Sequence, residues 1–418
     1  MLKTTFKKKG SFFMAKKYKM LGNVALTKDL TLLLIIGGVY SLSVALSNTF
    51  VNIYLWKQTG KYSDIALFNL SIVILQLLTF ILAGRWAKKI DRVIVLRIGV
   101  IFLAMFYLAV LLTGTRASTY LLLLGGLLGV GYGFYWLAYN VLTFEVTEPE
   151  TRDFFNGFLG ILSSAGGMIG PIAAGFIISR FEKFTGYSFV FGLSLGLFAL
   201  AVFMSFSLKR RQAAGRYCFK RILEERKQNE NWRSITNAHF FQGLREGTFG
   251  FVISVFVYIS TGSEMSLGTF GLLNSGISFV AYYFASRLIK KNHRKKAILI
   301  GGIMLYAAVL LIIWDVNFVK LMLYGGMIAI AYPLLQVPYS STTYDVIGSG
   351  WKAAEMRIEY IVVRELFLNY GRIVSILAFL AAVTWFNEEK SIPILLFILG
   401  AGHLLIYLCI RRVQIPAA

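Results

Sequence analysis

Long apolar segments constrain this chain more than any other feature of its sequence. A helix that crosses a lipid bilayer needs about twenty consecutive, mostly apolar residues, and its backbone must satisfy its own hydrogen bonds. Only 15% of the residues are charged, against roughly a quarter in a soluble domain. The sequence therefore predicts an all-α membrane protein with about twelve transmembrane helices. The windows are residues 31–56, 63–83, 93–114, 118–143, 155–179, 186–208, 237–260, 266–286, 297–314, 319–342, 356–385 and 391–410.

Basic residues are distributed unevenly among the segments that join these windows. With the N-terminus inside the cell, 33 of the 43 Lys and Arg residues fall on cytoplasmic segments and seven on outer loops. Membrane proteins keep their basic loops inside, so we expect a multi-pass plasma-membrane protein with both termini in the cytoplasm. The only cysteines, Cys218 and Cys409, then lie on the cytoplasmic side, where no disulfide is expected.

The net charge of +23 would suggest a nucleic-acid partner if the protein were soluble. Here the basic clusters border apolar spans, where they set the topology and contact lipid headgroups. We therefore expect a lipid bilayer as the partner, and no nucleic acid.

Two separate stretches of the chain repeat at a common offset of 202 residues: 84–92 aligns with 286–294, and 59–60 aligns with 261–262. The repeat predicts two pseudo-symmetric bundles of six helices each. The expected parts are a basic tail (1–30), a first bundle (31–208), a linker (209–235), a second bundle (236–411) and a tail (412–418). The charged linker is either a helix lying on the inner membrane face or a solvated connection.

The turn after the second span carries Gly84, Arg85 and Arg92, which resemble the cytoplasmic loop motif of the major facilitator superfamily. That motif implies a role in gating. Lys88 stands where the family has an Asp, and an acid appears only at Asp91. This departure puts the family's usual charge pairing in question. A simpler role for Asp91 is to cap the N-terminus of the third span.

The fifth span carries a small-residue motif around a proline. It resembles the motif of proton-coupled antiporters of the same superfamily, including bacterial efflux-type members. Small residues allow helices to approach closely, and an internal proline favours a bend, although ordinary helix packing explains the same pattern. The resemblance implies two halves that rock around a site near the bilayer midplane. The motif residues are Gly166, Gly167, Gly170, Pro171 and Gly175.

Ionisable residues inside spans are costly and usually mark a functional pathway. They gather in the seventh and eleventh windows, where Glu246 and Glu365 each lie about nine residues from the start, roughly 13 Å deep. We expect Arg245 to pair with Glu365, or Arg364 with Glu246. The roles left open are proton coupling, substrate contact and a purely structural ion pair. The candidate residues are Arg245, Glu246, Arg364, Glu365, Asn369 and Arg372.

Other polar and aromatic residues are candidates for lining a central cavity, although an aromatic face equally serves helix packing. The lone His403 is expected to be a packing residue. The cavity candidates are Asn48, Asn52, Gln76, Tyr135, Trp136, Tyr139, Asn140 and Asn274.

No phosphate-binding loop and no cluster with metal-ligand spacing occurs in the sequence. We expect no enzyme activity and no cofactor. The favoured function is proton-coupled export of a hydrophobic or amphiphilic small molecule by a monomer, because a desolvated carboxyl can titrate near physiological pH. The alternatives are an importer or lipid flippase of the same fold, and a membrane sensor or scaffold that transports nothing.

Overall fold

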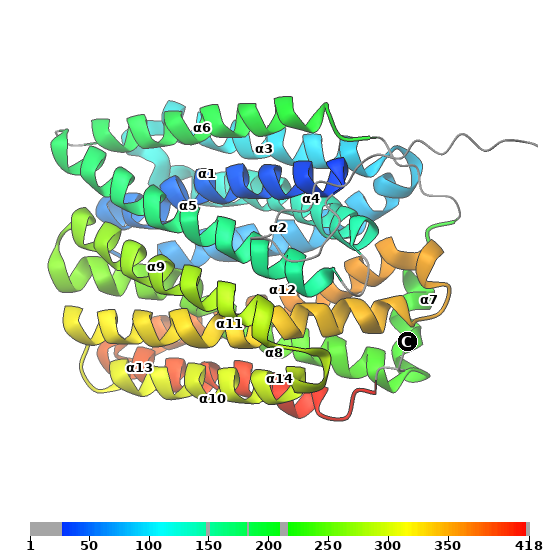
Figure 1. Cartoon of the computed structure of the whole chain (residues 1–418). Coiled ribbons are helices and arrows are strands. Elements are labelled where there is room, and N and C mark those ends of the chain that lie inside the picture. Colours follow the sequence, from blue (N-terminus) through cyan, green and yellow to red (C-terminus); the bar gives the residue numbers. More distant parts are fainter. Residues whose placement is uncertain (1–26, 148–150, 182–183, 210–215, 415–418) are drawn as a thin grey trace, which may run out of the picture.

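The computed structural model describes residues 27–147, 151–181, 184–209 and 216–414, apart from the side chains of residues 152 and 153. Most of the expected basic tail (1–30), part of the expected linker (210–215) and the last four residues lie outside this part. The described chain is almost entirely helical, and its long helices run side by side along one axis (Figure 1).

The first half of the chain contains six long helices. Their bounds are Lys28–Thr59 (α1), Tyr62–Lys89 (α2), Arg92–Thr113 (α3), Leu121–Val146 (α4), Arg152–Arg180 (α5) and Thr185–Ser205 (α6). The short helix Phe219–Glu224 (α7) follows. The second half contains Glu230–Thr261 (α8), Glu264–Leu288 (α9), Arg294–Ile313 (α10), Phe318–Gly348 (α11), Ala353–Trp385 (α12), Glu388–Gly400 (α13) and Gly402–Ile410 (α14). Three short 3₁₀ segments join them at Gly114–Tyr120, Glu225–Lys227 and Lys291–His293.

The helices form two bundles of six spans, with α13 and α14 together making the last span. The bundles meet where α5 packs against α9 and where α2 packs against α12. Figure 1 shows the first bundle above the second, with α9 and α12 along the boundary between them. The described chain is thus an all-α membrane protein of twelve spans in two pseudo-symmetric halves, as the sequence predicts.

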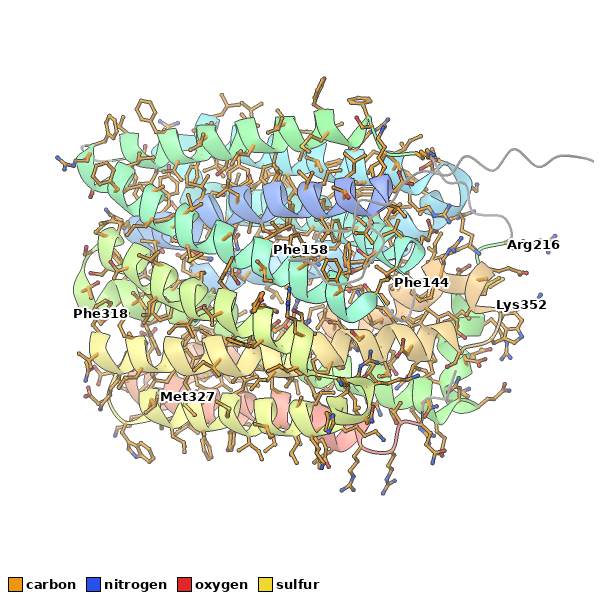
Figure 2. All side chains as sticks on the ribbon, in the orientation of Figure 1. Phe144, Phe158, Arg216, Phe318, Met327 and Lys352 are labelled. Atoms are coloured by element: carbon orange, nitrogen blue, oxygen red, sulfur yellow. The ribbon has the colours of Figure 1, made fainter. Side chains whose placement is uncertain are left out.

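The two ends of the bundle are chemically distinct. Arg216 and Lys352 lie at one end, beside α7, and Phe318 lies near the other (Figure 2). We call these the linker end and the opposite end. At the opposite end, Trp314 and Trp385 close α10 and α12 and are 80% and 77% exposed, as expected of aromatic side chains at a membrane interface.

By length and composition, nine stretches of the described residues qualify as candidate membrane spans, and one of them, Arg92–Val146, contains both α3 and α4. Helices α8 and α9 are long enough but do not reach the same apolar composition. Both helices turn polar residues toward the interior of the protein, which explains why they are less apolar than the spans that face mainly lipid.

Two spans differ from their sequence windows. Helix α8 begins at Glu230, capped by the Asn229 side chain, whereas the apolar window begins at residue 237. The last span is divided at Ala401 into α13 and α14. Gly402 lies there against the backbone carbonyl of Phe241 in α8, so close packing of the two helices accompanies the break.

The described part of the linker packs against protein. Ile222 of α7 is buried, and its carbonyl accepts a hydrogen bond from Trp232 Nε1 at 3.1 Å. The backbone N–H of Cys218 donates to Glu359 of α12 at 3.0 Å. The linker therefore rests on the linker end of α12.

Candidate functional site

A cavity of about 860 Å³ lies between the two halves. The first half lines it with uncharged side chains from α1, α2, α4 and α5. The second half lines it with charged side chains from α8 and α12. Of the residues selected from the sequence, the wall contains Asn48, Asn52, Gln76, Trp136, Tyr139, Asn140, Asn274, Arg245, Glu246, Arg364, Glu365 and Arg372.

Tyr135 and Asn369 were also candidates, but they lie behind this wall. Tyr135 is fully buried, and its ring stacks on Tyr40 with 3.9 Å between centroids. The amide of Asn369 donates to the backbone carbonyl of Glu365 at 2.9 Å and accepts from Arg372 Nη1 at 3.3 Å. Tyr135 therefore packs the first bundle, and Asn369 orients Arg372.

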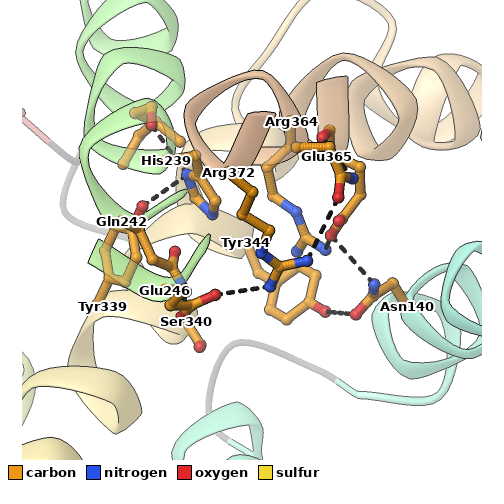
Figure 3. Close-up of polar contacts among 12 residues, drawn as sticks. Asn140, His239, Gln242, Glu246, Tyr339, Ser340, Tyr344, Arg364, Glu365 and Arg372 are labelled. Carbon is orange, nitrogen blue, oxygen red and sulfur yellow. Dashed lines mark hydrogen bonds and ion pairs between the residues drawn. The ribbon is translucent and has the colours of Figure 1, made fainter. Parts of the chain in front are cut away.

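An ion pair between α8 and α12 forms part of the cavity wall (Figure 3). Arg372 Nη2 lies 2.6 Å from Glu246 Oε2. The other carboxylate oxygen accepts from Gln242 at 2.8 Å and from Tyr332 at 3.4 Å. Glu246 is thus held by three donors from three helices, α8, α11 and α12.

The second carboxylate, Glu365, pairs with the neighbouring Arg364 of the same helix. Asn140 of α4 joins this group from the other half, donating to Glu365 Oε1 at 3.4 Å and accepting from the Tyr344 hydroxyl at 3.2 Å (Figure 3). This small network therefore connects α4 with α11 and α12 across the boundary between the halves.

Both pairings expected from equal depth, Arg245 with Glu365 and Arg364 with Glu246, are wrong. Helix α8 begins earlier than its apolar window, and this shifts its register against α12. A Cβ at Gly247 would lie 2.6 Å from the carbonyl oxygen of Arg372. Glu246 is therefore level with Arg372, two helical turns beyond Arg364.

Arg245 faces a different environment from its neighbour in sequence. It is 5% exposed, and its guanidinium lies 4.6 Å from the ring centroid of Phe249. Within the described part of the chain, its Nε and Nη2 atoms have no hydrogen-bond partner. His403 is buried nearby, and its two ring nitrogens likewise lack a described partner.

The loop motif at the linker end forms an ion-pair network. Lys88, which replaces the expected Asp, pairs with Glu359 of the second half at 2.8 Å, and both side chains are buried. Arg92 pairs with Glu145, which also lies 2.8 Å from Arg357 Nε across the boundary. The reversed charge at Lys88 is thus compensated by an acid on α12. This pairing was not predicted from the sequence, although the acid Glu359 near the start of a span was a signal for it.

The other residues of this loop motif, Asp91, Gly84 and Arg85, form no ion pair across the boundary among the described residues. Asp91 Oδ1 accepts from the N–H of Val93 at 2.6 Å and caps α3. Gly84 lies against Val362 and Tyr217 of the second half and the linker, so a larger side chain would meet them. Arg85 is exposed at the linker end.

A further inter-half ion pair lies at the opposite end of the cavity. Lys57 Nζ is 2.7 Å from Glu264 Oε1. The same oxygen accepts from the Tyr187 hydroxyl at 2.9 Å. Charged contacts between the halves are therefore present at both ends of the cavity.

The glycines of α5 face two different neighbours. Gly166 and Gly170 lie against the backbone of α1 in the same half, and a Cβ on Gly170 would come within 2.8 Å of it. Gly167 and Gly175 lie against α9 of the other half, where Pro171 also packs against Gly268 and Gly271. The motif therefore gives α5 one close contact within its half and one along the boundary.

No group of three or more His, Cys, Asp and Glu side chains in the described chain is placed to hold a metal ion. The cavity wall presents arginine, carboxylate, amide and aromatic side chains.

Sequence comparisons identify the relatives of this chain. The model of the Major Facilitator Superfamily matches residues 33–356. The chain is 64% identical over 401 residues to the uncharacterized protein YqgE of Bacillus subtilis (strain 168), covering 96% of this chain and 93% of YqgE. It is also 66% identical over 178 residues to an uncharacterized protein in the sodM 3′ region of Geobacillus stearothermophilus, covering 43% of this chain and 83% of that protein.

Several solved transporters have a similar fold. The human organic anion transporter MFSD10 (TETRAN) superposes with a TM-score of 0.70 at 14% identity, over 91% of this chain and 98% of its own. A bacterial homologue of the iron transporter ferroportin in an outward-facing state gives 0.66 at 17% identity, over 93% and 99%. The Escherichia coli fucose:proton symporter FucP gives 0.63 at 14% identity, over 92% and 98%. At sequence identities this low, the structural similarity shows a shared fold and nothing more.

Proposed function

The chain belongs to the Major Facilitator Superfamily, and from this membership we propose that it is a secondary active transporter that exports an amphiphilic small molecule in exchange for protons. The observation that carries the proposal is the Glu246–Arg372 ion pair in the wall of a cavity between the two halves. A cavity bounded by both halves suits alternating access. The uncharged, aromatic wall of the first half and the charged wall of the second suit an amphiphile.

The ion pair supplies a chemical basis for coupling. Beside a guanidinium a carboxylate remains charged, whereas a buried carboxyl that has lost its cation binds a proton readily. Glu246 and Arg372 both belong to the second half, so separating them requires α8 to move against α12 within that half as the two halves rock. Such a movement would load a proton on Glu246 from one side of the membrane. Renewed pairing would release the proton to the other side. Export is supported by the α5 motif, which resembles that of proton-coupled antiporters.

Proton-coupled import is the second candidate, and it is favoured by the position of the Glu246–Arg372 ion pair in the cavity wall. Protonation of Glu246 would leave Arg372 without its partner, and a negatively charged substrate would then find a cation to bind. The proton and the substrate would in that case bind together and move in the same direction.

Transport by the purified protein in proteoliposomes tests the proposal. A panel of amphiphilic anions, cations and neutral molecules is supplied with and without a pH gradient. If the substrate is exchanged for protons, it should accumulate on the acidic side of the membrane, because the protons leave that side. If the substrate moves together with protons, it should accumulate on the alkaline side. Transport that is unaffected by the gradient and by a protonophore would contradict proton coupling.

We propose that the linker end faces the cytoplasm, together with both termini, in the plasma membrane. The 33-to-7 distribution of basic residues supports this orientation. We also propose that the monomer is functional, because the cavity is bounded by the two halves of one chain.

This topology predicts the result of cysteine labelling in intact cells. Cys218 and Cys409 are partly buried, so both are first replaced by Ser. A single cysteine is then placed at exposed Lys227 of the linker end or at exposed Arg116 of the opposite end. An impermeant maleimide should label Arg116→Cys from outside and label Lys227→Cys only after permeabilisation. The reverse pattern would overturn the orientation.

A substitution in the α5 motif should impair transport. In Gly170→Leu, the new side chain meets the backbone of α1, because even its Cβ would lie 2.8 Å from Ala45 and Leu46 atoms. We expect normal membrane insertion but a transport rate reduced at least about tenfold, the equivalent of about 1.4 kcal/mol. Gly192→Leu is the matched control, because a Cβ there meets open space. Equal transport by the two variants would remove the proposed role of Gly170.

A further inference from the structure

The charges on the cavity wall do not balance. The wall contains three arginines, Arg245, Arg364 and Arg372, and two glutamates, Glu246 and Glu365. Each glutamate forms an ion pair with one of the arginines, Arg372 and Arg364. Among the described residues, Arg245 is therefore the one arginine of the wall without a carboxylate partner.

Arg245 is buried within the protein and still faces the cavity. Its exposed fraction is 5%, and two of its three guanidinium nitrogens have no described hydrogen-bond partner. Phe249, on the same helix, lies 4.6 Å from the guanidinium, measured to the ring centroid. The Tyr324 hydroxyl is a neutral hydrogen-bond partner of the guanidinium, but no carboxylate among the described residues balances its charge. A buried cation without a counter-charge costs free energy, so this position is explained most directly by an anion that arrives with the substrate.

The geometry of the guanidinium selects the kind of partner. Its planar, forked N–H donors match the two oxygens of a carboxylate. Phe249 packs against Arg245, Phe270 also lines the cavity from the second half, and Tyr40 and Trp136 line it from the first half. An aromatic body therefore finds suitable surfaces on both sides of the cavity.

We propose that the substrate is an aromatic organic anion whose carboxylate binds Arg245. The proposal rests on the transport function proposed above and specifies the substrate class of the same cavity. It also predicts that Arg245 acts by binding substrate. A different role, in which Arg245 becomes the partner of Glu246 when α8 moves away from α12, predicts that anion binding is unaffected by substitution of Arg245.

Equilibrium binding to the full-length protein in nanodiscs tests this proposal without a proton gradient. The probes are 2-naphthoate, 2-naphthamide and 2-naphthylmethylammonium, which share an aromatic body and differ in charge. Binding is measured by isothermal titration calorimetry. We expect 2-naphthoate to bind at least about tenfold more tightly than either of the other probes, a difference of about 1.4 kcal/mol.

The variant Arg245→Gln should lose this preference, and Arg245→Lys should retain part of it. Arg233→Gln is the matched control, since Arg233 is exposed on the same helix and pairs with Glu230 at the surface. Thermal unfolding provides a second readout. Arg245→Gln removes a buried cation that has no carboxylate partner among the described residues and two unpaired guanidinium nitrogens, so its unliganded melting temperature should be at least that of the wild type.

Each outcome decides the proposal. Equal affinity for naphthoate and naphthamide, absence of naphthoate binding, or an unchanged preference in Arg245→Gln would overturn it. Failure of proton coupling gives a different result, since Glu246→Gln would then transport like the wild type while the naphthoate preference remained. The binding experiment and the transport experiment can therefore fail independently.

Discussion

Glu246→Gln is expected to abolish accumulation of substrate driven by a pH gradient while leaving downhill exchange intact. Gln has nearly the same shape and still accepts hydrogen bonds, but it cannot exchange a proton. In the wild type, coupling of one proton per substrate gives up to about tenfold accumulation per unit of pH difference. The variant should show no accumulation, because its conformational cycle no longer depends on protons.

The measurement follows the substrate identified by the panel in proteoliposomes with and without a gradient. Glu365→Gln is made separately, because Glu365 pairs within its own helix and is not expected to be the carrier. Glu230→Gln, at an exposed position of α8, controls for the substitution itself. If Glu246→Gln and Glu365→Gln both fold and still accumulate substrate in a pH-dependent way, neither glutamate carries the proton.

Lys88→Ala is expected to have the largest effect on stability. The Lys88–Glu359 pair is buried, joins the two halves, and is supported by further hydrogen bonds. Lys88 Nζ also donates to the carbonyl of Glu355 at 2.9 Å and to that of Arg216 at 3.3 Å. Removing one partner leaves an uncompensated buried charge, at a cost of about 3–5 kcal/mol.

Two results should follow from this substitution. The protein should unfold at a lower denaturant concentration, and the linker end should open more often, because the pair holds the halves together there. The exchanged double variant Lys88→Glu/Glu359→Lys should recover part of the loss. An unfolding midpoint of Lys88→Ala in denaturant equal to that of the wild type would show that this pair does not stabilise the contact between the halves at the linker end.

Much of the fold was predictable from the sequence, because the bilayer imposes helix length and the internal repeat fixes two halves. Span ends were harder to predict, since they depend on caps such as Asn229, whose side chain starts α8 well before the apolar stretch. Because of this difference, Glu246 pairs with Arg372 in the structure, whereas the apolar windows predicted Arg364 as its partner. Pairing across helices depends on register, and apolar patterning determines register only approximately.

The cavity was predictable in composition but not in detail. Trp136 and Tyr139 line it, whereas the neighbouring Tyr135 turns into the bundle and stacks on Tyr40. Residues of one aromatic stretch point to different sides of a helix, and the sequence does not tell which side faces the partner half. The pairing of Lys88 could not be predicted either, because its partner Glu359 lies far away in the sequence and meets it only when the two halves pack together.

The central claim is that the two halves rock around the cavity under the control of a proton on Glu246. Double electron–electron resonance tests it without knowledge of the substrate. One spin-label pair is placed at Lys89 and Lys291 of the linker end and another at Arg116 and Asp315 of the opposite end, all exposed positions. We predict that acidification changes the two distances in opposite directions, and that Glu246→Gln abolishes this pH dependence. Distances that stay the same at acidic and alkaline pH, or that respond identically in Glu246→Gln, would contradict the claim.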